Sequence, residues 1–213
     1  MTRQEHINEY NQWKSTFKGW SVDKSFIINH LITKFDYKTY LEIGTNKGDC
    51  FKLINIEHKD GVDPLPGEFT NYNMSSDDFF NQLSFDFKYD IIFIDGLHRD
   101  YQVDKDITNS LIHLSENGTI VCHDMNPLFE ILAGEDFIVS TWNGDCWKSF
   151  AKLRASREDL EMFTVDTDYG VGIIRKGKQL LINIPDMLDY QFLNDNRQYV
   201  LNLISTDQFF KKF

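Results

Sequence analysis

The chain has 213 residues, the length of one ordinary domain, and its 15% aromatic content predicts a well-packed core. Lys and Arg number 22 against 33 Asp and Glu, and the net charge of −11 disfavours nucleic acid as a partner. We expect a cytoplasmic protein, because no apolar run approaches the roughly 18 residues of a membrane span, the first residues do not resemble a signal peptide, and the cysteines show no disulfide pattern.

Predicted helices and strands alternate along the chain. Apolar residues at helical spacing predict a first helix over 22–35, with Ser21 as its N-cap. The unbroken apolar run of 91–94 predicts a central strand that is buried on both faces. The elements expected after the first helix are a strand at 39–44, a helix at 47–56, strands at 59–64 and 87–96, a helix at 100–114, a strand at 118–124, a helix at 149–163, a hairpin at 163–177 and a helix at 197–213.

This alternation predicts an α/β fold: a doubly wound, mostly parallel central sheet with helices on both faces and an antiparallel edge hairpin. No internal repeat or linker-like segment divides the chain, so we expect a single domain over 1–213. Within it we expect a helical lead-in over 1–36, the core sheet over 37–178 and a helical tail over 179–213.

The loop in "YLEIGTNKGDCF" follows the first predicted strand, where parallel sheets present backbone N–H groups to ligands. Gly44 and Gly48 are too few for a dinucleotide fingerprint, since Asn46 stands where a second glycine is needed. A Walker A loop is also disfavoured, because Lys47 precedes Gly48 instead of following it.

"LEIGTNKG" resembles the first motif of class I S-adenosylmethionine-dependent methyltransferases, which have a Rossmann-like fold. The resemblance implies that S-adenosylmethionine is the cofactor and that Asp63, at the end of the second strand, accepts hydrogen bonds from both ribose hydroxyls. Asn46 stands at a position where many members of that family have glycine. The cofactor-binding residues that the resemblance implies are Glu42, Gly44, Thr45, Asn46 and Gly48 for the methionine portion, Asp63 for the ribose, Ser76 and Asp77 for the adenine edge, and also Asp95.

A second stretch, "FIDGLHRDYQVDKDI" with "NGTIVCHD", is similar to a branch of these enzymes that contains sugar and natural-product O-methyltransferases. It implies methyl transfer to a hydroxyl of a small-molecule or glycan acceptor. Asp95 and His98 follow one strand of this stretch, and His123 and Asp124 follow the next. The acidic pair that the branch usually carries is here His123-Asp124.

Two ways of activating the acceptor hydroxyl remain open from the sequence. His98 or His123 has the intrinsic pKa of a general base, with His98 slightly favoured and Asp95 as a catalytic neighbour. Alternatively, Asp95, Asp124 and His123 hold a divalent cation such as Mg²⁺ that lowers the pKa of the hydroxyl.

Several residues and functions also have competing interpretations. Asp166 and Asp168 suit either a cation site or a solvated hairpin turn, and Trp142, Trp147 and Phe150 either an acceptor pocket or the core. The chain could be a catalytically silent methyltransferase-like binding module or an NAD(P)-dependent oxidoreductase. The sequence does not specify the acceptor or the oligomeric state.

Overall fold

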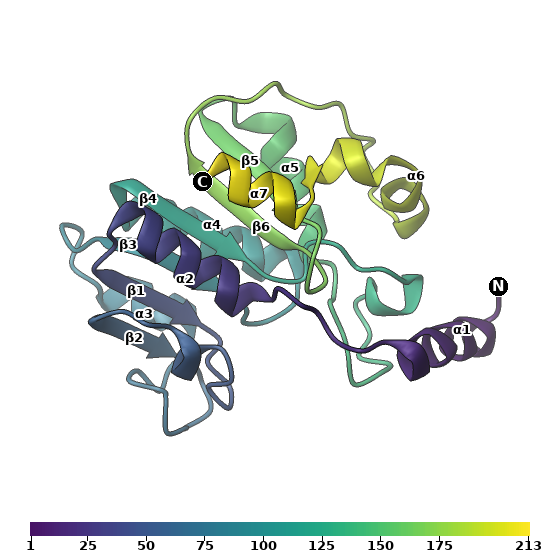
Figure 1. Cartoon of the computed structure of the whole chain (residues 1–213), viewed down its shortest axis with the longest axis horizontal. Helices are drawn as coiled ribbons and strands as arrows, with labels where there is room; N and C mark the ends of the chain where they lie inside the picture. The colour runs from purple at the N-terminus through teal and green to yellow at the C-terminus, as the bar shows by residue number, and fades with distance from the viewer.

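A seven-stranded sheet forms the centre of the computed structural model, which describes residues 1–213 (Figure 1). Neighbouring strands pair in parallel except at β6, which is antiparallel to both β4 and β5. The predicted doubly wound, mostly parallel sheet with an antiparallel hairpin is confirmed, and β7 forms the edge beyond that hairpin. In their order across the sheet, the strands are β2 His58–Val62, β1 Thr39–Ile43, β3 Tyr89–Ile94, β4 Leu114–Cys122, β6 Val171–Lys176, β5 Leu160–Val165 and β7 Leu203–Ile204.

Strand β3 lies in the middle of the parallel part of the sheet and is buried on both faces, as its apolar run predicts. Side chains along a strand alternate between the two faces. Ile91 and Phe93 therefore belong to one apolar cluster, and Ile92 and Ile94 belong to the other.

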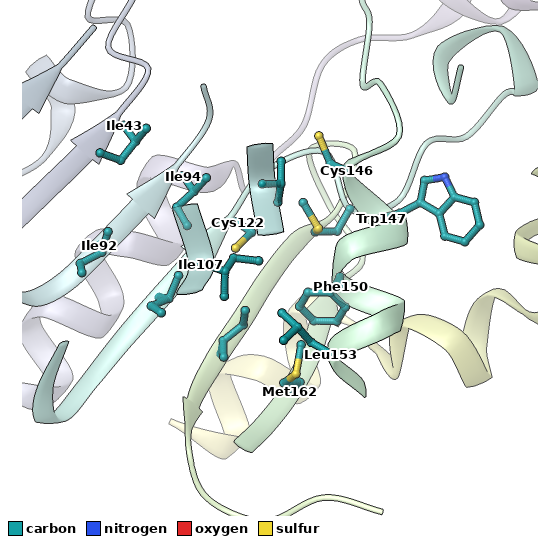
Figure 2. Close-up of a cluster of buried hydrophobic side chains, with 14 of the residues drawn as sticks. Ile43, Ile92, Ile94, Ile107, Cys122, Cys146, Trp147, Phe150, Leu153 and Met162 are labelled. Atoms are coloured by element: carbon teal, nitrogen blue, oxygen red, sulfur yellow. The ribbon is translucent and has the colours of Figure 1, made fainter. Parts of the chain in front are cut away.

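Helices cover both faces of the sheet. Helices α3, α4, α5 and α6 contribute to the larger cluster, and α2 and α7 contribute to the cluster on the opposite face. Figure 2 shows part of the larger cluster, where Phe150 and Leu153 of α5 lie beside Met162 of β5. The helices are α1 Arg3–Thr16, α2 Lys24–Phe35, α3 Ser76–Gln82, α4 Asp100–Ile112, α5 Cys146–Ser156, α6 Tyr190–Leu201 and α7 Thr206–Lys212, with 3-10 turns at η1 Phe51–Leu53 and η2 Glu130–Leu132.

The helix predicted over 47–56 is wrong, because only the short turn η1 forms there. Asn46 and Gly48 both have positive φ angles, +45° and +70°, which an α-helix cannot contain. The segment stays a loop, in which the N–H groups of Gly44, Asn46 and Gly48 donate to Val62, Asp63 and Thr45.

Other predicted boundaries differ for local reasons. Helix α2 is capped by Asp23, whose carboxylate accepts the Phe26 N–H, and not by Ser21. Helix α5 ends at Ser156, because residues from Leu160 onward pair with β6.

The predicted C-terminal helix is also divided into several elements. It is interrupted at Asn202, which takes a left-handed conformation with a φ of +48°. Strand β7 follows and pairs with β5 before α7 begins.

Helix α1 lies beyond the sheet and packs on η2 through aromatic side chains (Figure 1). Tyr10 is buried there, and its ring meets those of Trp13 and Phe129. The N-terminal helix thereby supports the segment after β4 that leads into the functional site. None of the helices is long and apolar enough to cross a membrane.

Candidate active site

A cavity of about 820 Å³ opens where β1, β2, β3 and β4 end. Parallel strands deliver the loops that follow them to one edge of the sheet, which is the usual position for ligands in such folds. The volume lies within the usual range for ligand pockets, about 300–1,000 Å³. Every residue predicted to bind the cofactor lines this cavity except Gly48, which lies in the same loop.

The loop after β1 bends sharply at Gly44, whose φ is +90°. Its N–H donates to the Val62 carbonyl at 2.8 Å, which ties the loop to the end of β2. Asn46 accepts the left-handed conformation that Asn tolerates better than most residues. The loop can therefore turn tightly at Asn46 although this residue is not glycine.

Asp63 is buried and holds this loop with its carboxylate. One oxygen accepts the Asn46 N–H at 2.8 Å and the other accepts the Leu65 N–H at 2.8 Å. Because a carboxylate oxygen can accept more than one hydrogen bond, both oxygens can still receive donors from the cavity. Thr45 is likewise buried, with its hydroxyl 2.9 Å from that of Thr70.

Glu42 lies at the floor of the cavity and is only 1% exposed. Burial raises the pKa of its carboxyl to about 8, although the Tyr40 hydroxyl donates a hydrogen bond to it. A buried carboxyl of this kind is suited to a cationic ligand group, which would favour its ionised form.

Ser76 and Asp77 begin α3 and line the cavity. Gln102 of α4 joins them, since its Nε2 donates to Ser76 Oγ at 3.2 Å and to Asp77 Oδ1 at 3.0 Å. The same amide reaches the fully buried Asp106 at 3.1 Å. Gln102 is a cavity residue that sequence reasoning missed.

Four residues predicted to be catalytic or metal-binding, Asp95, His98, His123 and Asp124, line the cavity together and form a histidine–aspartate cluster. His98 Nε2 lies 3.4 Å from Asp95 Oδ1, and His98 Nδ1 lies 3.2 Å from Asp124 Oδ2. His123 Nδ1 lies 3.1 Å from Asp95 Oδ1 and 3.3 Å from Asp124 Oδ1. The ends of β3 and β4 are neighbours in the sheet, and this brings the two pairs into contact.

The protonation of this cluster follows from burial and charge. Burial alone lowers the pKa of His98, but contacts with Asp95 and Asp124 raise it to about 9. The buried His123 likewise has its pKa raised well above the ordinary value, because the same two carboxylates outweigh desolvation. Burial acts to raise the pKa of Asp95, yet His123 and Lys24 hold it well below its usual range.

Comparisons with known proteins agree with this geometry. Residues 52–125 match the family model of a methyltransferase domain. The matched segment runs from η1 to the residues after β4, so it includes Asp95, His98, His123 and Asp124. No curated protein matches the sequence.

Several solved structures resemble this chain in fold. Cofactor-bound Rv0187 from MTB superposes with a TM-score of 0.55 at 12% identity, over 73% of this chain and 79% of that one. The Podospora anserina methyltransferase PaMTH1, bound to SAH, gives 0.52 at 16% identity, over 81% and 88%. The Bacillus cereus O-methyltransferase in complex with SAH gives 0.50 at 14% identity, over 84% and 93%.

Two further residues reach the histidine–aspartate cluster and were not predicted to act there. Lys24, the first residue of α2, has its Nζ 3.1 Å from Asp95 Oδ2. Asp168, in the β5–β6 turn, lies 3.4 Å from His123 Nε2 and is 14% exposed at its side chain. The predicted hairpin turn forms and Asp166 is exposed, but the Asp168 side chain is largely buried against His123. Lys24 carries no local signal in the sequence, because only the packing of α2 brings it to the cavity.

The three candidate aromatic residues divide between the cavity and the core. Trp142 lines the cavity, with its ring 5.4 Å from that of His98 and its carbonyl 2.7 Å from His98 Nδ1. Trp147 and Phe150 are fully buried in the core (Figure 2).

The ligand atoms that lie within 4.8 Å of one another, and so could share a metal ion, belong to Asp95, His98 and Asp124. The sequence placed His123 in this group instead of His98. His123 also touches both carboxylates, but its other ring nitrogen faces Asp168. The set offers two carboxylates and one imidazole, whereas Mg²⁺ prefers oxygen ligands alone.

Proposed function

We propose that the chain is an S-adenosylmethionine-dependent O-methyltransferase that acts on a hydroxyl of a sugar or another small molecule. The observation that carries this proposal is the continuity of the cavity. One hollow is lined both by Glu42, the Gly44 loop and Asp63 and by the histidine–aspartate cluster. A cofactor and an acceptor placed there would meet beside His98.

The first part of the cavity suits the proposed cofactor. Glu42 would face the methionine ammonium, and the loop N–H groups that have no partner within the protein, such as that of Thr45, would face its carboxylate. Both oxygens of Asp63 are fixed by backbone donors and would accept the vicinal ribose hydroxyls. Ser76, Asp77 and Gln102 would border the adenine.

His98 is the better supported of the two candidate bases. Its Nδ1 faces the Trp142 carbonyl at 2.7 Å, so this nitrogen carries the proton and donates. Nε2 is then the atom that accepts the proton of the acceptor hydroxyl. The His123 side chain is only 7% exposed, against 21% for His98, so an acceptor in the cavity reaches it less easily.

When bound, S-adenosylmethionine supplies a methyl group on a positively charged sulfur, and the transfer is an in-line displacement. The protein has to hold the acceptor oxygen against that methyl group and to remove one proton. Asp95 orients His98 and stabilises its protonated form. Trp142, stacked on His98, fixes the ring from the other side.

The acceptor end of the cavity favours a neutral, hydroxyl-rich molecule. Trp142 and Tyr169 offer aromatic faces, and Ser140, Thr141 and Asn143 offer hydrogen-bonding groups. The net charge of −11 of the whole chain disfavours an anionic acceptor. We also infer a cytoplasmic location, because the three cysteines are free and buried, as a reducing compartment allows.

Calorimetric titration with S-adenosylmethionine, followed by a screen of sugars and small polyols with labelled cofactor, tests this function. We expect micromolar binding and label transfer that is lost in His98→Asn. Binding without transfer to any acceptor would instead support a catalytically silent module. Tight binding of NAD in place of S-adenosylmethionine would support an oxidoreductase.

A further inference from the structure

Lys24 places an ammonium group inside the histidine–aspartate cluster. Its Nζ lies 3.1 Å from Asp95 Oδ2 and 3.5 Å from His123 Nδ1, and its side chain is 24% exposed. Two backbone contacts fix the position of Lys24 at the start of α2. Asp23 caps α2, and the Lys24 N–H donates to Asp168 Oδ2 at 3.1 Å.

The carboxylates around Lys24 already have partners. Asp95 contacts Lys24 through one oxygen and both histidines through the other. Asp124 accepts a hydrogen bond from the Asn143 side-chain amide in addition to its histidine contacts. The cluster as a whole thus contains three carboxylates and three groups that can carry positive charge: Asp95, Asp124 and Asp168 with Lys24, His98 and His123.

This donor set does not fit a resident hard divalent cation. Asp95 would have to be one of its ligands, because it belongs to the group of three residues whose ligand atoms lie close together. An ammonium already bonded to the same carboxylate repels a second cation there. The set also includes an imidazole nitrogen, which Mg²⁺ accepts poorly.

We propose that Lys24 is the resident cation of this site, where it holds Asp95 toward the cavity and makes methyl transfer independent of a divalent metal. Lys24 is in this sense a positioning residue. The role of Lys24 in catalysis rests on the proposed function. Whether Lys24 keeps a divalent cation away from the carboxylates can be measured without cofactor or acceptor.

The first experiment is a Mn²⁺ titration of the full chain, followed by electron paramagnetic resonance. We expect wild type and Lys24→Arg to bind Mn²⁺ weakly, and Lys24→Met to bind at least about tenfold more tightly. The gain should disappear in Lys24→Met/Asp95→Asn. Lys148→Met is the matched control, because Lys148 is 25% exposed and pairs with Asp145 outside the cavity, and it should bind Mn²⁺ like wild type.

The second experiment measures methyl transfer to an acceptor found by the screen, with and without EDTA. We expect wild type to retain its activity in EDTA, Lys24→Met to lose most of it, and Mn²⁺ to restore part of the loss. Tight Mn²⁺ binding by wild type, no gain in Lys24→Met, or loss of wild-type activity in EDTA would each overturn the proposal. If Lys24→Met does not fold, the wild-type and Lys24→Arg titrations still decide it. Failure of the proposed function would appear separately, as no binding of S-adenosylmethionine by wild type.

Discussion

Replacing Gly44 by alanine tests whether the end of β1 must touch the end of β3 for the site to form. A Cβ at Gly44 would lie 2.3 Å from the Asp95 carbonyl oxygen and 2.5 Å from the Gly96 Cα. Both are backbone atoms, so no side chain can turn away to make room. The strand ends would have to separate by roughly 1 Å, which strains the hydrogen bond from Asp95 N–H to the Ile43 carbonyl, 2.9 Å long.

Two contributions give the size of the effect. The φ of +90° costs an alanine about 1 kcal/mol. The overpacking adds about 1–3 kcal/mol, so Gly44→Ala should lose about 2–4 kcal/mol of unfolding free energy. Gly19→Ala is the control, because Gly19 has the same φ of +90° but nothing within 4 Å of an added Cβ. It should lose only about 1 kcal/mol.

Urea unfolding followed by circular dichroism measures both variants, and titration with S-adenosylmethionine follows on the folded proteins. We expect Gly44→Ala to lower the midpoint by about 1–2 M and to weaken cofactor binding strongly. Equal midpoints for the two variants, with unchanged cofactor affinity in Gly44→Ala, would refute the close approach of β1 and β3 as the reason for this glycine.

Three further predictions concern ionisable groups of the site. His98 must lose its proton to act as a base, and its pKa is raised to about 9, so the rate should increase with pH from neutral through that value; a pH profile of kcat/KM that is flat between these limits would remove His98 from this role. Glu42 has a pKa raised to about 8 by burial, so at lower pH the affinity for S-adenosylmethionine should fall by up to about tenfold per pH unit, while Glu42→Gln should show no such dependence in calorimetry. Asp63→Ala removes the acceptor of the Asn46 and Leu65 N–H groups, at a cost of about 0.5–1.5 kcal/mol each, and should weaken cofactor binding at least tenfold; an unchanged dissociation constant would exclude Asp63 from the site.

The predictions that succeeded rest on local patterns with a direct physical cause. The apolar run of 91–94 indicates burial on both faces, and β3 occupies the middle of the parallel strands. Glycines after a strand indicate a tight loop, and Gly44 takes the positive φ that only glycine accepts readily. Asp95, His98, His123 and Asp124 could be grouped because parallel strands end at one edge.

The predictions that failed involve choices that local periodicity cannot make. Residues 160–163 continue a helical pattern, yet they join β5 because β6 offers them a partner strand. Residues 203–204 lie inside an amphipathic stretch, yet they pair with β5 at the open edge of the sheet. In both places the hydrogen bonds of the sheet replace those of the predicted helix.

The sequence by itself determined the α/β architecture, the position of the cavity and most of its lining, because these depend on periodicity and on the order of elements. Only the tertiary structure decided which charged side chains meet in the cavity. Lys24 and Asp168 come from segments 144 residues apart, and they meet at His123 and Asp95 only after α2 and the β5–β6 turn have packed against the sheet. Contacts between such distant segments depend on how the elements pack in space, and no spacing along the chain records them.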